Sequence, residues 1–355
     1  MKRIFILVFF LGLAGGALAQ GSEEFYYQLA GYWSPIIYQD TWFMPEGDYL
    51  TRFDGDGDWV GNNNLDNFLK GKFRPYPAYL YYTVMESKTH YFIIYGFFHP
   101  VDYDHPLRRI IPGTTHENDM EGMMVVVQKV EDNPMGRFRL FETWAHNWWN
   151  IYSSKKGLKP RKVWRVEKAY LEGSHPLIYI QRGGHGPYGL YSWKSAYKYR
   201  GDFKGHKGVI YRFKGRAEAP EGPNDREVGY DLIPFDAPGG IWERRCDLST
   251  FDAEPLVYQP PPSRPSLKPN PKGCPFKDQQ VPRAFDGDLS GFANRPDAAN
   301  CFWGWGKSLP QTGKSKGIWA FDPAWAINWQ FEFEEDFSLE YIYNPFLELG
   351  GSEER

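Results

Sequence analysis

Residues 112–130, PGTTHENDMEGMMVVVQKV, place a histidine and several carboxylates at the head of an apolar segment. Alternate residues of a β-strand point to one face, so Asp119 and Glu121 share a face that becomes apolar after them. Two neighbouring carboxylates at the edge of an apolar core repel each other and resist desolvation, and a bound cation relieves both effects. The pattern predicts a metal site to which His116 contributes an imidazole, swung over the same face by a bend in the preceding turn.

The ligand types indicate which metals this site would take. Carboxylate oxygens with one imidazole favour Mg²⁺, Mn²⁺ or Ca²⁺ over structural Zn²⁺. The segment is not the His-Glu-x-x-His motif of zinc proteases, because Met120 stands where the second histidine would be. The alternative interpretation is a solvated loop with an incidental histidine and acids, and local spacing alone does not decide between the two.

Two other segments carry candidate residues for the same site. Asp102 follows an aromatic-proline corner in YGFFHPVDYD, and His185 ends the strand-like segment IYIQRGGHGPYG. The glycines beside His185 allow the backbone and the imidazole to approach a ligand closely. His99 and His105 flank Asp102 and are further candidate ligands.

The pattern His-x-x-Asp-x-Glu, with the upstream aspartate and the downstream Gly-His pair, resembles the necrosis- and ethylene-inducing-like protein superfamily. It is also similar to the related vacuolar-sorting-associated-like β-sandwich proteins. In the first family the heptapeptide Gly-His-Arg-His-Asp-Trp-Glu supplies metal ligands, which match His116, Asp119 and Glu121 here. The resemblance implies that Asp102 is the upstream acidic ligand and that His185 lies beside the metal pocket.

The resemblance covers about residues 75–195, roughly a third of the chain. Within it, Asn118 replaces the family's second histidine and Met120 replaces its tryptophan. What the resemblance implies is a β-sandwich that holds a metal ion, rather than the toxin activity known in the family.

A second acidic segment, TRFDGDGDWVGNNNLDN, is a possible second metal loop. Its candidate ligands are Asp54, Asp56, Asp58, Asn62 and Asp66. Alternating aspartates in a glycine-containing loop can collect oxygens around one Ca²⁺, but the helix-loop-helix calcium motif fails because Trp59 and Leu65 occupy its glycine and glutamate positions. Two alternatives stay open: a loop stabilised by Asx turns, or one aspartate reaching the main metal.

The elements that position these residues are predicted to be strands. Aromatic residues make up 18% of the chain, and short aromatic and β-branched runs recur between glycine, proline, asparagine and aspartate clusters. Such runs are AYLYYTVMES, HYFIIYGFFHP, GMMVVVQKV, RFRLFETWAH, PLIYIQRGG and GVIYRFKG, and NPMG between two of them predicts a tight hairpin turn. GNNNLDNFLKG predicts one short helix capped by an asparagine. We expect an all-β fold: a single jelly-roll-like β-sandwich with long loops and few short helices.

The chain divides into a leader and one predicted domain. Residues 1–19 have the basic start, apolar core and Ala-Leu-Ala cleavage site of a secretory signal peptide. Residues 20–355 are expected to form the single β-sandwich domain. The proline-rich stretch at about 255–276 is expected to run over the surface as a loop, because the strand-like segments after it, IWAFDPAWAINWQFEF and LEYIYNPF, are too few for a separate core.

The leader predicts an extracellular or periplasmic protein without a transmembrane anchor. An oxidising compartment permits one disulfide among Cys246, Cys274 and Cys301, and we expect one pair to staple the proline-rich loop. The net charge of −3 and the scattered basic residues argue against a nucleic-acid partner.

Three functions are compatible with these features. The first is a secreted protein that binds a divalent metal and recognises a surface glycan or a lipid headgroup. The second is a metal-dependent hydrolase of phosphoesters, esters or glycosides, in which His185 would act as acid or base because its ordinary pKa lies near neutrality. The third is an envelope or matrix protein stabilised by Ca²⁺.

Overall fold

The computed structural model describes residues 22–103, 116–145, 148–154, 157–192, 207–252, 255–256, 274, 281–282, 285–287, 301–304 and 318–350. The predicted signal peptide, His105 and most of the proline-rich loop lie outside the described residues.

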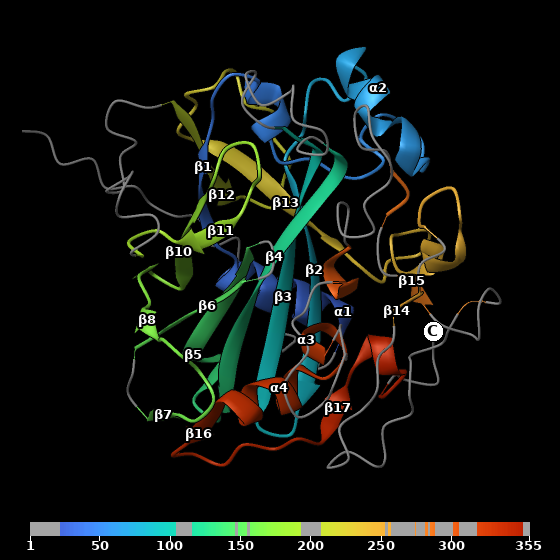
Figure 1. The fold of residues 1–355 in the computed structure, drawn as a ribbon. Coiled ribbons are helices and arrows are strands. Elements are labelled where there is room, and N and C mark those ends of the chain that lie inside the picture. The colour runs from blue at the N-terminus through green and yellow to red at the C-terminus, as the bar shows by residue number, and fades with distance from the viewer. Residues whose placement is uncertain are drawn as a thin grey trace, which may run out of the picture.

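Strands are the predominant regular element of the described chain (Figure 1). They are β1 Ile36–Asp40, β2 Tyr79–Ser87, β3 His90–Asp102, β4 His116–Val130, β5 Asn133–Ala145, β6 Trp148–Ser153, β7 Leu158–Pro160, β8 Glu167–Lys168, β9 Leu171–Glu172, β10 His175–Ile180, β11 Pro187–Gly189, β12 Gly208–Phe213, β13 Val228–Pro234, β14 Pro255–Leu256, β15 Val281–Pro282, β16 Phe331–Phe333 and β17 Tyr341–Tyr343. The helices are α1 Glu23–Trp33, α2 Asn64–Leu69, α3 Ile318–Phe321 and α4 Pro323–Gln330, with short 3₁₀ turns η1 Pro45–Asp48, η2 Gly61–Asn63, η3 Glu243–Cys246, η4 Phe302–Gly304 and η5 Pro345–Leu347.

One large mixed sheet organises the described residues. Its order is β11-β10-β1-β12-β13-β2-β3-β4-β5-β6-β8, with β9 beside β10 and β17 beside β2. The central strands β2 to β6 are joined by antiparallel pairing, whereas β1–β10, β12–β13 and β13–β2 are parallel. The six predicted strand segments lie within or overlap β2, β3, β4, β5, β10 and β12, so the strand-rich character predicted from the sequence is confirmed.

The sheet curls until its β11 end packs over β5 and β6. At Gly189 in β11 an added Cβ would lie 2.6 Å from the ring of Tyr152 in β6, so the two backbones approach closely. Ala145 of β5 shares a small apolar cluster with Tyr179 and Tyr188 of the β10–β11 hairpin. The result is one continuous sheet shaped like a half barrel, and the predicted β-sandwich of two sheets is not confirmed.

Helix α1 covers the central strands and was not predicted from the sequence. Ser22 caps it, since its hydroxyl accepts the backbone N–H of Phe25 at 3.1 Å. Tyr95 of β3 donates its hydroxyl to the Ala30 carbonyl of α1 at 2.6 Å. The absence of a β-carbon at Gly31 lets the helix approach Phe213, whose ring would be 2.5 Å from an added Cβ.

The predicted short helix at residues 61–71 is confirmed as η2 followed by α2. Its cap residue is Asn63, whose side chain donates to Asp58 instead of capping the helix.

The segment IWAFDPAWAINWQFEF, expected to be strand-like, forms α3, α4 and β16. The reason is local: Asp322 accepts the backbone N–H of Trp325, and Pro323 begins α4, where its missing N–H costs nothing.

The predicted hairpin between β4 and β5 is present, but its turn is Glu131–Asp132 and not NPMG. Asn133 pairs with Val130, and the following residues form a β-bulge in which Gly136 has φ 72°. A Cβ at Gly136 would lie 2.5 Å from the Gln128 carbonyl oxygen. The glycine of NPMG therefore marks a β-bulge within β5, and the tight turn predicted at NPMG is wrong.

A disulfide joins Cys246 to Cys274, across a separation of 28 residues. It ties the proline-rich loop to the 3₁₀ turn η3, as the sequence led us to expect, and leaves Cys301 as a buried thiol. Among the described residues, no helix combines the length and apolar character needed to cross a membrane.

The core contains one carboxyl group that should control the pH dependence of stability. Glu142 of β5 is fully buried, and the Gln330 amide of α4 lies 3.4 Å from its carboxyl oxygen. Burial raises the pKa of Glu142 from 4.5 to about 8, and hydrogen bonds from Gln330 and Trp319 offset only part of this rise. The folded state therefore binds more protons than the unfolded state between these two pH values, so this group makes the protein less stable as pH rises through that window.

We expect Glu142→Gln to remove this contribution. The free energy of unfolding of the variant, relative to wild type, should rise between pH 5 and pH 8 by at most about 1.4 kcal/mol per pH unit. Urea unfolding at three pH values measures it, with the exposed Glu334→Gln as control. Parallel pH profiles for Glu142→Gln and wild type would show that Glu142 is not the responsible group.

Candidate metal centre

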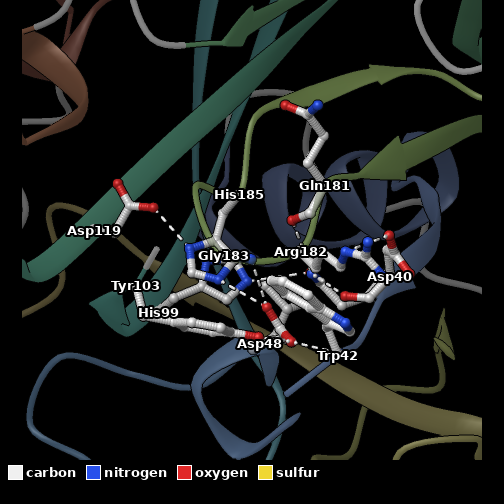
Figure 2. A network of polar contacts seen from close by, with 12 residues as sticks. Asp40, Trp42, Asp48, His99, Tyr103, Asp119, Gln181, Arg182, Gly183 and His185 are labelled. Carbon is white, nitrogen blue, oxygen red and sulfur yellow. Dashed lines mark hydrogen bonds and ion pairs between the residues drawn. The ribbon is translucent and has the colours of Figure 1, made fainter. Parts of the chain in front are cut away.

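The candidate site lies where the end of β3 meets the start of β4. Two further segments close over it: the turn at residues 181–186 that follows β10, and the 3₁₀ turn η1. Figure 2 shows Asp119 of β4 pointing toward His185, with His99 beside His185 and Asp48 below them. Because β3 and β4 are antiparallel, residues of the two strands that face one another come together at one end of the sheet.

The pairing of β3 with β4 sets two cross-strand pairs. His99 lies opposite Asp119, and Asp102 lies opposite His116. Asp102, His116 and Asp119 offer ligand atoms that all lie within 4.8 Å of one another, and His116 Nε2 is 3.3 Å from Asp102 Oδ2. We call these three residues the outer cluster. The side chains of Asp102 and His116 are 17% and 14% exposed, so the cluster is open on one side.

A left-handed residue brings His116 and Asp119 to the same face. In a regular strand, residues three apart point to opposite faces, but Asn118 has φ 62° and breaks the alternation. Its side chain donates to the carbonyls of Gly61 and Asp286, both at 2.7 Å. Asparagine tolerates this backbone region better than most residues. The position at which this chain departs from the family's second histidine thus shapes the site without supplying a ligand atom.

The charge of Asp102 and Asp119 acts on the His116 imidazole. Burial lowers the pKa of His116, but the hydrogen bond to Asp102 and the charges of both carboxylates outweigh it and raise the pKa to about 9. In the absence of a metal, the outer cluster is therefore balanced by a protonated imidazole at neutral pH. A divalent cation would have to replace that proton.

His185 is held from both sides by carboxylates. Its Nδ1 is 2.7 Å from Asp119 Oδ2, and its Nε2 is 3.3 Å from Asp48 Oδ1. The residue is fully buried and has φ 39°, in a turn where Gly183 has φ 76° and an added Cβ would lie 2.6 Å from the Tyr103 carbonyl oxygen. Burial lowers the pKa of His185, but the hydrogen bonds to Asp119 and Asp48 outweigh it and raise the pKa to about 9.

Asp48 links this centre to the exposed side chains of Trp42 and Phe43, which we call the rim. Its carboxylate accepts the backbone N–H of Gly183 at 2.8 Å, the Tyr103 hydroxyl at 2.6 Å and the backbone N–H of Trp42 at 3.1 Å, in addition to contacting His185. The residue is fully buried. Sequence analysis missed it, because its segment, MPEGDYL, shows no metal-ligand spacing. The only available signal was an acid between a Pro-Glu-Gly turn and an apolar pair.

His99 stacks on His185 with 3.7 Å between ring centroids and 8° between ring planes. Its Nε2 lies 3.2 Å from Gln39 Oε1. Burial lowers the pKa of His99 well below 6.5, and the positive charge of His185 lowers it further. His99, Asp119 and His185 offer a second set of ligand atoms within 4.8 Å of one another, which we call the inner cluster.

Glu121 shares the face of Asp119 as predicted, but it lies deeper. It is buried opposite Phe97 of β3 and near Tyr188 of β11. Burial raises the pKa of Tyr188 to about 12, and the charge of Glu121 adds to that rise. Among the described residues, Glu121 belongs to neither ligand cluster. Three of the four predicted metal ligands, Asp102, His116 and Asp119, therefore lie close together. Glu121 stays a predicted ligand.

The second acidic segment uses its side chains for turns and ion pairs. Asp54 pairs with Arg52, and Asp58 accepts the backbone N–H of Val60 at 2.8 Å. Asp56 accepts from the backbone N–H of Asp58 at 3.3 Å and from Asn67, Asn62 is exposed, and Asp66 pairs with Lys70. Among the described residues, this segment contributes no group of three converging ligands. The geometry favours the Asx-turn alternative.

The comparisons with known proteins show only a weak likeness of fold. No family model matches the chain, and no curated protein matches it. The chain is similar to the solved structure of the non-toxic HaNLP3 protein, with a TM-score of 0.31 and 13% identity over 59% of this chain and 74% of that chain. It is similar to NLPPya in complex with mannosamine, with a TM-score of 0.28 and 13% identity over 61% and 75% of the two chains.

A third similar structure is Necrosis and Ethylene inducing Protein 2 from the causal agent of cocoa's Witches Broom disease. Its TM-score is 0.26 at 11% identity, over 59% of this chain and 73% of that chain. At such values the likeness carries no argument about chemistry.

We expect Asp48→Asn to destabilise the protein. Asp48 faces only donors, so the amide nitrogen of asparagine would meet two of them, and about 3 kcal/mol should be lost from two broken bonds to a charged group. Guanidinium unfolding measures the loss, and Asp66→Asn is a matched control because that side chain is 73% exposed and only pairs with Lys70. Equal midpoints for Asp48→Asn and wild type would show that this carboxylate does not hold the turn.

Proposed function

We propose that this protein is secreted and binds a divalent cation at Asp102, His116 and Asp119, and that the loaded site recognises a surface glycan. The observation that carries the proposal is the outer cluster: three converging ligand atoms at the open end of β3 and β4, two of them on partly exposed side chains. An ion held by such a cluster would keep coordination positions on its exposed side. Sugar hydroxyls could occupy those positions.

The chemistry of the cluster supports a hard cation. Two carboxylates and one imidazole favour Mg²⁺, Mn²⁺ or Ca²⁺, and Glu121 on the same face could act through a bound water. The resemblance of residues 116–121 to the metal-binding heptapeptide of the necrosis- and ethylene-inducing-like proteins supports the same ligand set. We therefore infer a distant kinship with that superfamily.

The rim supplies an aromatic surface that is connected to Asp119 of the outer cluster through Asp48 and His185. Trp42 and Phe43 are 36% and 51% exposed, and the Arg182 guanidinium lies over the Trp42 ring, 4.3 Å from its centroid (Figure 2). Arg182 also lies 3.8 Å from Asp40. An aromatic plane beside a guanidinium suits the apolar face and the hydroxyls of a sugar ring. This combination favours a glycan over a lipid headgroup.

The other two functions are less well supported. In the hydrolase alternative His185 is the acid or base, but this imidazole is fully buried and both its nitrogens contact carboxylates. It is placed to hold Asp119 rather than to touch a substrate. A purely structural calcium protein would need no exposed aromatic rim, whereas Trp42 and Phe43 form one here.

Cation binding should be visible as thermal stabilisation. We expect excess Mn²⁺ or Mg²⁺ to raise the melting temperature of wild type, since ligand at 100-fold over Kd adds about 2.7 kcal/mol. Asp119→Asn should remove this response without unfolding the protein. Asp58→Asn, in the second acidic segment, should lower stability slightly through its lost turn but retain the full response. Equal responses in wild type and Asp119→Asn would contradict the site.

Glycan recognition is tested directly on a glycan array with and without a chelator. We expect binding that chelation abolishes, and a loss of about tenfold or more in Trp42→Ala, because a stacked aromatic contributes on the order of 1.5 kcal/mol. Trp164→Ala is the matched control: that tryptophan is 91% exposed and lies outside the rim. Binding to glycan-free anionic liposomes instead, or substrate turnover, would replace the glycan proposal.

A further inference from the structure

We propose that His99, His185 and Asp119 form a second metal site, one that takes a first-row transition metal such as Zn²⁺ and shares Asp119 with the outer cluster. The proposal concerns the inner cluster alone and does not depend on any glycan. Its basis is the buried His99, whose Nδ1 has no hydrogen-bond partner among the described residues, together with the convergence of ligand atoms from His99, Asp119 and His185.

The tautomer of His99 follows from its neighbours. The Gln39 amide nitrogen donates to the backbone carbonyls of Asp40 at 3.1 Å and Gln181 at 3.3 Å. Those carbonyls can only accept, so Gln39 Oε1 is the atom that faces His99 Nε2 at 3.2 Å. Nε2 must therefore carry the proton, and Nδ1 presents a lone pair.

That lone pair has no hydrogen-bond partner among the described residues, although His99 is fully buried. A buried acceptor without a partner is costly, and in native proteins such a group points to an ion, a water or a functional role. Of the two groups that converge with His99, Asp119 is an acceptor and His185 gives its Nδ1 proton to Asp119. A cation is the partner that satisfies all three groups at once.

The second ring nitrogen of each histidine lies near an oxygen atom, as it does in metal-ligating histidines. A metal-bound imidazole usually gives its other N–H to a carbonyl or carboxylate oxygen, which fixes the ring. His99 Nε2 faces Gln39 Oε1, and His185 Nε2 lies 3.3 Å from Asp48 Oδ1. The rings of His99 and His185 are stacked and nearly parallel, and a ligand atom of each lies within 4.8 Å of one of Asp119.

The donor set selects a different metal from the outer cluster. Two imidazoles and one carboxylate suit Zn²⁺, Co²⁺ or Fe²⁺, whereas oxygen-rich sets suit Mg²⁺, Mn²⁺ and Ca²⁺. Coordination by His185 Nδ1 displaces the proton that this atom now shares with Asp119, and that proton goes to solvent. With N–metal bonds of about 2.0–2.1 Å, the two nitrogens would lie about 3.3 Å apart, and the two stacked rings would have to rotate so that their lone pairs converge on one ion.

Asp119 belongs to both clusters, so it would bridge two ions. Bridged pairs of metal ions typically lie about 3.5–4 Å apart. The inner ion would be enclosed, because His99 and His185 are fully buried, and the outer ion would face solvent. The Asp119 carboxylate would thus connect an enclosed metal ion in the inner cluster to a metal ion in the outer cluster that takes part in recognition.

The test uses metal-free protein titrated with Co²⁺, whose visible absorption reports nitrogen-containing low-coordinate sites, and elemental analysis after loading with Zn²⁺ and Mg²⁺ together. We expect an absorbing Co²⁺ site and two ions per chain. His99→Gln should weaken Co²⁺ binding by about 100-fold or more while Mn²⁺ binding, followed by its paramagnetic resonance, persists. His116→Gln should weaken Mn²⁺ binding while Co²⁺ binding persists. His90→Gln, which alters another buried histidine at the far end of β3, should change neither.

A readout without mutation guards against variants that fail to fold. Imidazole ¹⁵N spectra of wild type with Zn²⁺ should show two histidines protonated at Nε2 and metal-shifted at Nδ1. Unchanged imidazole spectra, or Co²⁺ binding that survives His99→Gln, would overturn the second site. If wild type binds Co²⁺ but neither Mn²⁺ nor a glycan, the proposed function is refuted and the second metal site stands.

Discussion

The antiparallel pairing of β3 with β4 is the constraint on which the rest of the centre depends. A constant register from Gly96–Gly122 to Asp102–His116 fixes His99 against Asp119 and Asp102 against His116. Regular alternation would still separate these two pairs onto opposite faces. The left-handed backbone of Asn118 prevents this separation. The hydrogen bonds from its side chain to the carbonyls of Gly61 and Asp286 are therefore part of the site, although they involve no candidate ligand.

The centre also accumulates buried negative charge. Asp48 and Asp119 are both removed from water, and an isolated buried carboxylate costs several kcal/mol. The fold compensates with donors: two backbone N–H groups and a tyrosine hydroxyl surround Asp48, and His185 lies between the two acids. The raised pKa of His185 reflects this compensation, because the two carboxylates stabilise the positive charge of the protonated ring. A cation in the same place would supply the positive charge that the proton supplies.

Sequence reasoning found the parts whose signal is local. Strand segments follow from aromatic and β-branched runs, and the shared face of Asp119 and Glu121 follows from a period of two. It failed where tertiary contacts decide: α1 depends on packing against the sheet, and Asp322 with Pro323 turns an apolar run into α4. Gln39 and Asp48 could not be found, because their roles come from the curl of the sheet that brings β1 and η1 beside the turn at 181–186.

The same curl explains why recognition and metal binding would be coupled in this protein. Asp48 holds the backbone of Trp42 on the rim and the turn that carries His185 in the interior. The two contacts use the two oxygens of one rigid, fully buried carboxylate, so a displacement of the rim loop must alter the position of His185 or break a bond to a charged group. His185 in turn holds Asp119, the residue common to both clusters. A ligand on the rim would thereby be connected to a bound ion through Asp48, His185 and Asp119, which are in direct contact and would give the coupling a physical path.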